Sequence, residues 1–207
     1  MSAVDGAITA LRAGEPVVMP FDTVYGLASD ASEPAVRRLY ALKGRDSQRP
    51  TALVAATLDR LLQELPELAV EAGVLLPGPV TLVVPNSARR FPWLTGATPE
   101  AIGIRVPELS GAAAQILERV GVVVATSANR PGEPDPMTLD EVPQEIRSGA
   151  GAVVDGGALP GTPSTVVDLT GPEPRVLREG ALPAGEILRR LRSAVRSSGH
   201  MCPYPPT

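Results

Sequence analysis

The chain has 207 residues, of which 43% are hydrophobic, so it is long enough for one sizeable domain with its own core. Its net charge of −4 does not favour a nucleic-acid binder that relies on overall basicity. Cys202 and His200 are the only residues of their types, which excludes a disulfide framework and argues against a Cys/His zinc site. No apolar run could span a bilayer and no basic-then-apolar leader opens the chain, so we expect a cytoplasmic protein without a membrane partner.

In the first half of the chain, hydrophobic periodicity predicts alternating helices and strands. Ser32 is placed to cap the second helix, which has Pro34 in its first turn and Gly44 at its end. A short polar turn is expected within 19–27, and a charged loop at 44–50. The predicted helices cover 4–13, 32–43, 58–65 and 68–76, and the predicted strands cover 16–20, 51–56, 80–84 and 102–106.

The second half continues the alternation. Ser110 is placed to cap a helix that Gly121 ends, and the strand after it is the most apolar in the chain. We interpret the glycine-rich segment 156–163 as a flexible connection rather than a phosphate cradle, because it lacks lysine. The predicted helices cover 110–120, 140–148 and 187–195, and the predicted strands cover 122–125, 152–155, 164–169 and 175–178.

This alternation favours one α/β domain with a mixed sheet over residues 1–196. Nothing periodic follows, so residues 197–207 are expected to form a disordered tail. Basic and small polar residues gather where predicted strands end or turn, which is where an open α/β sheet places its ligands. These clusters contain Asp22, Thr23 and Tyr25; Lys43, Arg45 and Arg49; Arg105; Ser127 and Asn129; and Ser164, Thr165 and Arg178.

Such a set of side chains suits the binding of anions, because guanidinium groups match carboxylates and phosphates and lysine adds a point charge. It does not suit acid–base catalysis near pH 7. An enzyme built on it would act by positioning and charge neutralisation, as in phosphoryl or nucleotidyl transfer. Neither G-x-x-x-x-G-K-[ST] nor G-x-G-x-x-G after a strand occurs.

Each cluster also has a purely structural interpretation. Lys43 and Arg45 could complement a helix dipole, and Ser127 could form a turn. Tyr25 fits a core ring with one satisfied hydroxyl. Arg105 is harder to explain structurally, because an arginine in a short apolar strand needs a partner or a cleft. Taken singly, these clusters identify no function.

The order of these clusters along the chain, taken together, does indicate a function. The chain contains, in this order, P-x-D-T-V-Y-G-L at 20–27, K-G-R-x-x-x-x-P at 43–50, P-G-P-x-T at 77–81, G-I-R-V-P at 103–107, T-S-A-N at 126–129, P-S-T-V-V-D at 163–168 and R-x-G-A at 178–181. This succession resembles the threonylcarbamoyl-AMP synthase (YrdC-like) family in its short single-domain form. The resemblance implies a twisted mixed sheet with flanking helices and a large basic concave cleft.

The resemblance also implies a reaction. L-threonine, bicarbonate and ATP, accompanied by Mg²⁺, would give threonylcarbamoyl-adenylate and pyrophosphate, for the modification of tRNA. RNA or tRNA and tRNA-modification proteins would be further partners. By family position, Lys43 and Arg45 would be catalytic, holding the carboxylated amine and the phosphates. The substrate-binding residues would be Thr23, Tyr25, Arg105, Ser127 and Ser164, and the ATP-binding residues would be Arg45, Arg49, Asn129 and Arg178.

Three positions depart from the family pattern. Phe21 stands where threonine is usual, Val54 where many members have histidine, and Arg130-Pro131-Gly132 where Ser-Gly is usual. Two alternatives stay open, the first of which is motivated by Phe21 and Val54. One is an RNA-binding protein of the same fold without synthase activity; the other is a related carbamoyl-adenylate-forming enzyme with another carbamoyl source.

Overall fold

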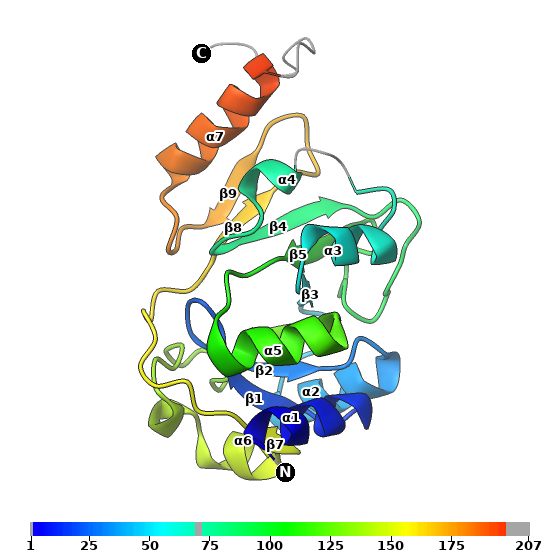
Figure 1. Cartoon of the computed structure of the whole chain (residues 1–207). Coiled ribbons are helices and arrows are strands. Elements are labelled where there is room, and N and C mark those ends of the chain that lie inside the picture. The colour runs from blue at the N-terminus through cyan, green and yellow to red at the C-terminus, as the bar shows by residue number, and fades with distance from the viewer. Residues whose placement is uncertain (1, 69–71, 198–207) are drawn as a thin grey trace.

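The computed structural model describes residues 2–68 and 72–197, so the expected tail lies outside it from residue 198 onward. Within these residues, nine strands form one sheet in the order β7-β1-β2-β6-β3-β5-β4-β8-β9 (Figure 1). The strands are β1 (Val17–Pro20), β2 (Tyr25–Ser29), β3 (Ala52–Ala55), β4 (Val80–Pro85), β5 (Ala101–Arg105), β6 (Val122–Ser127), β7 (Ala152–Val153), β8 (Thr165–Asp168) and β9 (Arg175–Arg178).

The sheet is mixed, as the alternation predicted. The pairs β1–β7, β3–β5 and β4–β8 are parallel, whereas β1–β2, β2–β6, β3–β6, β4–β5 and β8–β9 are antiparallel. The helices are α1 (Ala3–Arg12), α2 (Glu33–Lys43), α3 (Leu58–Glu64), α4 (Ala72–Leu75), α5 (Gly111–Val120), α6 (Gln144–Gly149) and α7 (Ala184–Ser197), with a 3₁₀ turn at Leu139–Glu141.

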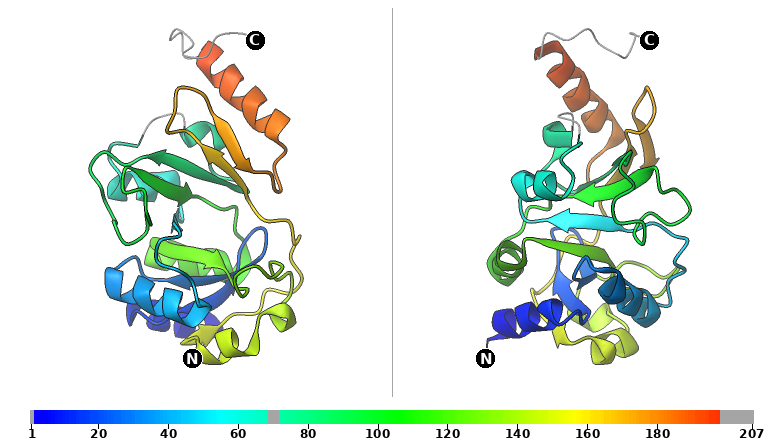
Figure 2. Two further views of the ribbon diagram at one scale, coloured as in Figure 1. Left: turned by 180° about the vertical axis from the view of Figure 1, so that it is seen from behind. Right: turned by 90° about the vertical axis from the view of Figure 1, so that its right-hand side faces the viewer.

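The helices bury both faces of the sheet. Along β1, Val17 and Met19 join the apolar cluster under α1 and α5, whereas Val18 joins the larger cluster that includes α2, α3 and α7. This alternation follows from the two-residue period of a strand. Figure 2 shows α1 and α5 on one side of β1 and β2, and α2 on the other.

One strand was not predicted. The expected turn is confined to residues 21–24, where the Phe21 N–H donates to the Val24 carbonyl over 3.1 Å. Residues 25–29 form β2, which pairs with β1 and β6 and is fully buried. The run Tyr-Gly-Leu-Ala-Ser contains no β-branched residue, so pairing on both sides overrides a weak local propensity.

Several helix predictions also needed correction. The helix expected over 140–148 is divided into the 3₁₀ turn and α6, because Pro143 has no N–H to donate. In the region predicted as helix over 68–76, Leu68 is not helical, α4 begins at Ala72, and 69–71 lie outside the described residues. Ser32 and Ser110 occupy N-cap positions, but neither side chain makes the capping hydrogen bond.

Candidate functional site

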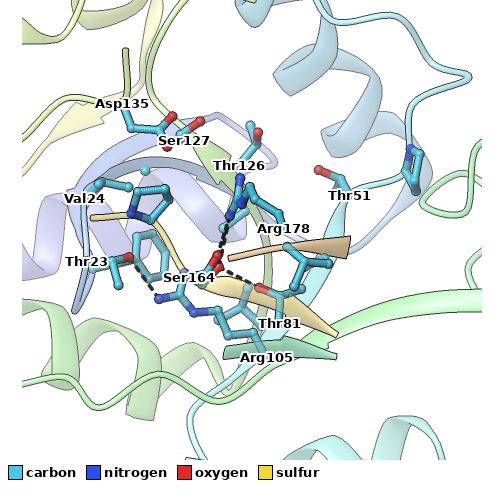
Figure 3. Close-up of a pocket in the computed structure, with 18 of the residues that line it drawn as sticks. Thr23, Val24, Thr51, Thr81, Arg105, Thr126, Ser127, Asp135, Ser164 and Arg178 are labelled. Atoms are coloured by element: carbon cyan, nitrogen blue, oxygen red, sulfur yellow. Dashed lines mark hydrogen bonds between the residues drawn. The ribbon is translucent and has the colours of Figure 1, made fainter. Parts of the chain in front are cut away.

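A cavity of about 220 Å³ opens where the β1–β2 turn, the loop after α2 and the ends of several strands meet (Figure 3). Three arginines from distant parts of the chain converge on it. The lining residues are Phe21, Thr23, Val24, Gly26, Arg45, Pro50, Thr51, Ala52, Val54, Thr81, Arg105, Ala125, Thr126, Ser127, Asp135, Pro163, Ser164, Val166 and Arg178.

Arg105, the last residue of β5, forms one end of the cavity. Its Nη2 pairs with the Asp22 carboxylate and donates to Thr23 Oγ1 over 3.0 Å. Both charged side chains are nearly buried, and the desolvation that results raises the pKa of Asp22 and lowers that of Arg105 despite their attraction. Nε of Arg105 is buried without a hydrogen-bond partner among the described residues. This guanidinium therefore keeps an unused donor.

Ser164 forms the neighbouring wall. Its hydroxyl lies 2.9 Å from the Thr81 hydroxyl, and its carbonyl accepts from Arg178 Nη2 over 2.7 Å. Figure 3 shows Ser164 between Arg178 and Arg105. The return of the chain after β9 requires glycine at position 180, because a Cβ there would lie 2.1 Å from the Pro163 carbonyl oxygen. Strand pairing and this close approach together hold Arg178 against Ser164.

Lys43 lies behind the cavity wall, unlike the arginines that line the cavity. It lies in the last turn of α2, which Gly44 ends in the left-handed conformation at φ 64°. Its Nζ donates to the Ser127 carbonyl (2.5 Å), the Asn129 carbonyl (2.8 Å) and Asn129 Oδ1 (2.7 Å). These three bonds use all the protons of an ammonium group. Lys43 is buried and is not among the lining residues.

The environment of Lys43 lowers its pKa to about 8. Burial is the main cause, the positive charge of Arg45 adds to it, and the negative charge of Asp135 opposes it. Asn129 is held in turn by Ser127 Oγ, which donates to its Oδ1 over 2.7 Å, and by its own Nδ2, which donates to the Glu133 carbonyl over 2.6 Å. The Lys43 group is thus a closed hydrogen-bonded cluster behind the Ser127 wall.

Arg45 and Arg49 belong to the same motif but lie in different surroundings. Arg45 lines the cavity, donates from Nη2 to the Pro50 carbonyl over 2.6 Å, and has a buried Nε without a partner among the described residues. Burial lowers its pKa. Arg49 is exposed and does not line the cavity.

The structure therefore brings together most of the residues singled out in the sequence. Six line the cavity directly, and Lys43 and Asn129 bond to its wall through Ser127. The six are Thr23, Arg45, Arg105, Ser127, Ser164 and Arg178.

Tyr25, which the resemblance placed among the substrate-binding residues, is not one of the residues that line the cavity. Its ring is fully buried, and its hydroxyl lies 2.9 Å from both Asp155 Oδ1 and the Gly157 carbonyl and accepts from the Gly156 N–H over 2.8 Å. The hydroxyl is committed to joining β2 to the segment after β7. This arrangement matches the purely structural interpretation of Tyr25, a core ring with a satisfied hydroxyl.

Four polar lining residues were not assigned to the site from the sequence, namely Thr51, Thr81, Thr126 and Asp135. Thr81 carried a signal, because it ends the P-G-P-x-T motif, and its hydroxyl bonds to Ser164. Asp135 lies in a proline-rich loop that offered no pattern. Phe21 and Val54, noted only as departures, both line the cavity.

The carboxylates near the cavity do not form a metal site. Among the described residues, no group of three His, Cys, Asp or Glu side chains could hold a metal ion, and Asp135 is the one acidic residue in the described lining. Across the described residues, no helix is long and apolar enough to cross a membrane.

Residues 9–180 match the Sua5/YciO/YrdC family model, described as "Telomere recombination". A Pyrococcus abyssi protein named threonylcarbamoyl-AMP synthase is 35% identical over 185 residues, which are 86% of this chain and 54% of that protein. A Mycobacterium tuberculosis protein named putative threonylcarbamoyl-AMP synthase is 35% identical over 84% of this chain and 82% of its own length.

The fold agrees with these matches. The crystal structure of Pyrococcus abyssi Sua5 complexed with L-threonine superimposes with a TM-score of 0.81 at 32% identity, covering 92% of this chain and 58% of that one. This chain thus spans little more than half of the archaeal protein but most of the mycobacterial one. The chain belongs to the Sua5/YciO/YrdC family.

Proposed function

We propose that this chain is an L-threonylcarbamoyladenylate synthase, a nucleotidyltransferase that uses L-threonine, bicarbonate and Mg²⁺-bound ATP. The observation that carries the proposal is the convergence of Arg45, Arg105 and Arg178 with six hydroxyl-bearing side chains on one cavity. The names of the matching relatives support the same reaction. Its substrates are anions, which this lining suits.

The reaction has two steps that balance as follows. The ammonium group of threonine loses a proton to solvent, and the neutral amine attacks the carbon of bicarbonate, or of the CO₂ derived from it, forming a carbamate and releasing water. A carbamate oxygen then attacks the α-phosphorus of ATP, and the bond to the β-phosphate oxygen breaks to release pyrophosphate. Both reactants of the second step are negative, so their repulsion must be neutralised before they can meet.

Arg105 is the proposed anchor for the threonine carboxylate. Its Nη2 already bonds to Asp22 and Thr23. Its buried Nε has no hydrogen-bond partner among the described residues and can donate to a ligand. A guanidinium group with its position fixed in this way loses little freedom when it binds a carboxylate. The hydroxyls of Thr23 and Ser164 line the same cavity and would hold the rest of the amino acid.

Arg45 and Arg178 are the proposed phosphate ligands, with Ser127 on the wall between the amino acid and the nucleotide. Lys43 and Asn129 would act through Ser127, by holding it in place and adding positive charge behind it. Mg²⁺ would be carried by the triphosphate. Arg49 is exposed and outside the cavity lining, so we assign it no direct contact with the reacting atoms.

The proposal is tested by measuring pyrophosphate release with purified protein and Mg²⁺-bound ATP. We expect release that requires both threonine and bicarbonate, and that an Arg45→Ala variant loses. Equal release without threonine would contradict the proposal. Salt-sensitive RNA binding without any turnover would favour the RNA-binding alternative instead. Dependence on another carbamoyl donor would favour the related carbamoyl-adenylate-forming enzyme.

The place of the reaction in the cell is also a proposal. The adenylate product is a reactive mixed anhydride, so an enzyme that transfers the threonylcarbamoyl group to tRNA must consume it. We propose that this transfer takes place in the cytoplasm.

A further inference from the structure

A second cavity, of about 480 Å³, lies next to the first. Its walls are the β1–β2 turn, the start of α5 and the segment after β7, and its lining includes Asp22, Glu108, Ser110, Asp155 and Leu159. Phe21 is the one residue that lines both cavities. Phe21 therefore stands between the two spaces, and its ring lies against Gly26, which lines the first cavity.

The ring of Phe21 is fixed in this position. The backbone N–H of Phe21 closes the tight turn to Val24, and the residue is only 5% exposed. A Cβ on Gly26 would lie 2.5 Å from Phe21 Cε2, so glycine at that position makes room for the ring. Val54 belongs to the same apolar cluster. Tightly packed rings of this kind yield little to an entering group.

The next residue extends the partition. Asp22 lines the second cavity but pairs with Arg105, which lines the first. The wall between the two spaces thus consists of the Phe21 ring and this ion pair. Phe21 and Thr23 line the same cavity as Arg105, so an amino acid whose carboxylate sits on Arg105 has Phe21 as part of the surrounding wall.

We propose that Phe21 is the specificity-determining residue that limits the length of the amino-acid side chain, by closing the first cavity against the second. The inference rests on the proposed function. Threonine carries a short branched side chain that the smaller cavity can hold. A side chain longer by one or two carbons would need the space that the ring occupies, and an apolar pocket typically discriminates by about 10- to 200-fold between substrates that differ by one methylene.

The test compares pyrophosphate release with L-threonine, L-isoleucine and L-leucine for the wild-type chain, Phe21→Ala and Phe21→Leu. We expect the wild type to favour threonine. Phe21→Ala should raise the ratio of kcat/KM for leucine to that for threonine by about tenfold or more, within the usual range for a change in apolar pocket volume. Phe21→Leu should shift the ratio in the same direction by less. Leu159→Ala is the matched control, because it enlarges only the second cavity and should leave the ratio unchanged.

The outcomes separate the two proposals. Wild-type protein that releases no pyrophosphate in response to threonine contradicts the proposed function. Wild-type protein that responds to threonine, with an unchanged leucine-to-threonine ratio in folded Phe21 variants, contradicts the role of Phe21 alone. Circular dichroism identifies any unfolded variant, and Phe21→Leu, which keeps most of the buried apolar volume, then decides the question.

Discussion

The basic groups of the site fall into two regions with opposite hydrogen-bonding states. In the Lys43 region, every ammonium proton is donated to an oxygen of Ser127 or Asn129. In the arginine region, Arg45 and Arg105 each keep a buried Nε with no partner among the described residues. One region is satisfied within the protein, and the other retains donors for a ligand.

This difference distinguishes basic residues that can bind the substrate from those that hold the wall of the site in place. A buried donor without a partner costs free energy, and a substrate oxygen that reaches it recovers that cost on binding. A donor already paired with protein oxygens would have to break those bonds first. We therefore expect the arginines to bind substrate directly and Lys43 to fix the wall that the substrate contacts.

The largest effect should come from Arg105→Gln. The substitution removes the proposed carboxylate anchor and leaves Asp22 buried without a counter-charge, so we expect threonine-dependent kcat/KM to fall by about 100-fold or more. Breaking a buried ion pair should also lower the free energy of unfolding by about 3–5 kcal/mol. Denaturant titration and pyrophosphate release measure the two effects.

Asp22→Asn combined with Arg105→Gln separates stability from binding. Removing both charges relieves the unpaired carboxylate, so the double variant should regain much of the lost stability. It should not regain activity. Recovery of threonine-dependent activity in the double variant would show that Arg105 serves only to pair Asp22.

The second prediction concerns pH and the Lys43 region. With a pKa of about 8, Lys43 loses its charge as the pH rises through that value, and a neutral amine can no longer donate all three bonds. Activity should therefore fall by about tenfold on the alkaline side with a midpoint near pH 8. Because Asp135 raises this pKa, Asp135→Asn should move the midpoint downward. Lys43→Arg should move it upward, since a guanidinium stays protonated.

The same group makes a prediction about stability. The pKa of Lys43 in the folded chain lies below its ordinary value of 10.5, so the unfolded chain binds more protons between about pH 8 and pH 10.5. The contribution of Lys43 to the free energy of unfolding should therefore rise with pH across that window. Lys43→Met should abolish this slope, and a slope that persists in the variant would assign it to another group.

The third prediction tests a group that belongs to neither region. Tyr25→Phe removes a hydroxyl that joins β2 to Asp155, Gly156 and Gly157. We expect the free energy of unfolding to fall by about 1–3 kcal/mol, the cost of leaving such partners unsatisfied. The KM for threonine should stay near its wild-type value, because the ring does not line the cavity. A large rise in this KM would return Tyr25 to the substrate site.

The smallest effect is expected from Arg49→Ala. Arg49 is exposed and outside the cavity lining, so kcat/KM for ATP should stay within about twofold of the wild-type value. Arg45→Ala, which alters the neighbouring cavity residue, is the matched comparison. A loss in Arg49→Ala as large as that in Arg45→Ala would restore Arg49 to the nucleotide site.

The sequence predicted much of the fold, because most elements carry strong periodicity. The apolar runs of β3, β4 and β6 and the amphipathic pattern of α5 locate these elements within a few residues. It could not predict β2, whose residues have weak strand propensity and form a strand because β1 and β6 flank them. Pairing between distant segments is not encoded in a local pattern.

The same limit applies to the site. The motifs indicated which residues gather around the cavity, but not which of them keep free donors. The state of Lys43 depends on carbonyl oxygens 84 and 86 positions further along the chain, at the end of β6. The state of Tyr25 depends on a loop more than 130 positions away. Only the folded arrangement separates the residues that bind from those that support.

The most direct measurement of the central claim follows labelled carbon. The protein is incubated with ¹³C-bicarbonate, L-threonine and Mg²⁺-bound ATP, and the products are analysed by mass spectrometry and ¹³C NMR. The account predicts a threonylcarbamoyl-adenylate that carries the bicarbonate carbon, formed by the wild type and lost in Arg105→Gln. An adenylate without the labelled carbon, or a labelled product that Arg105→Gln makes as fast as the wild type, would contradict it.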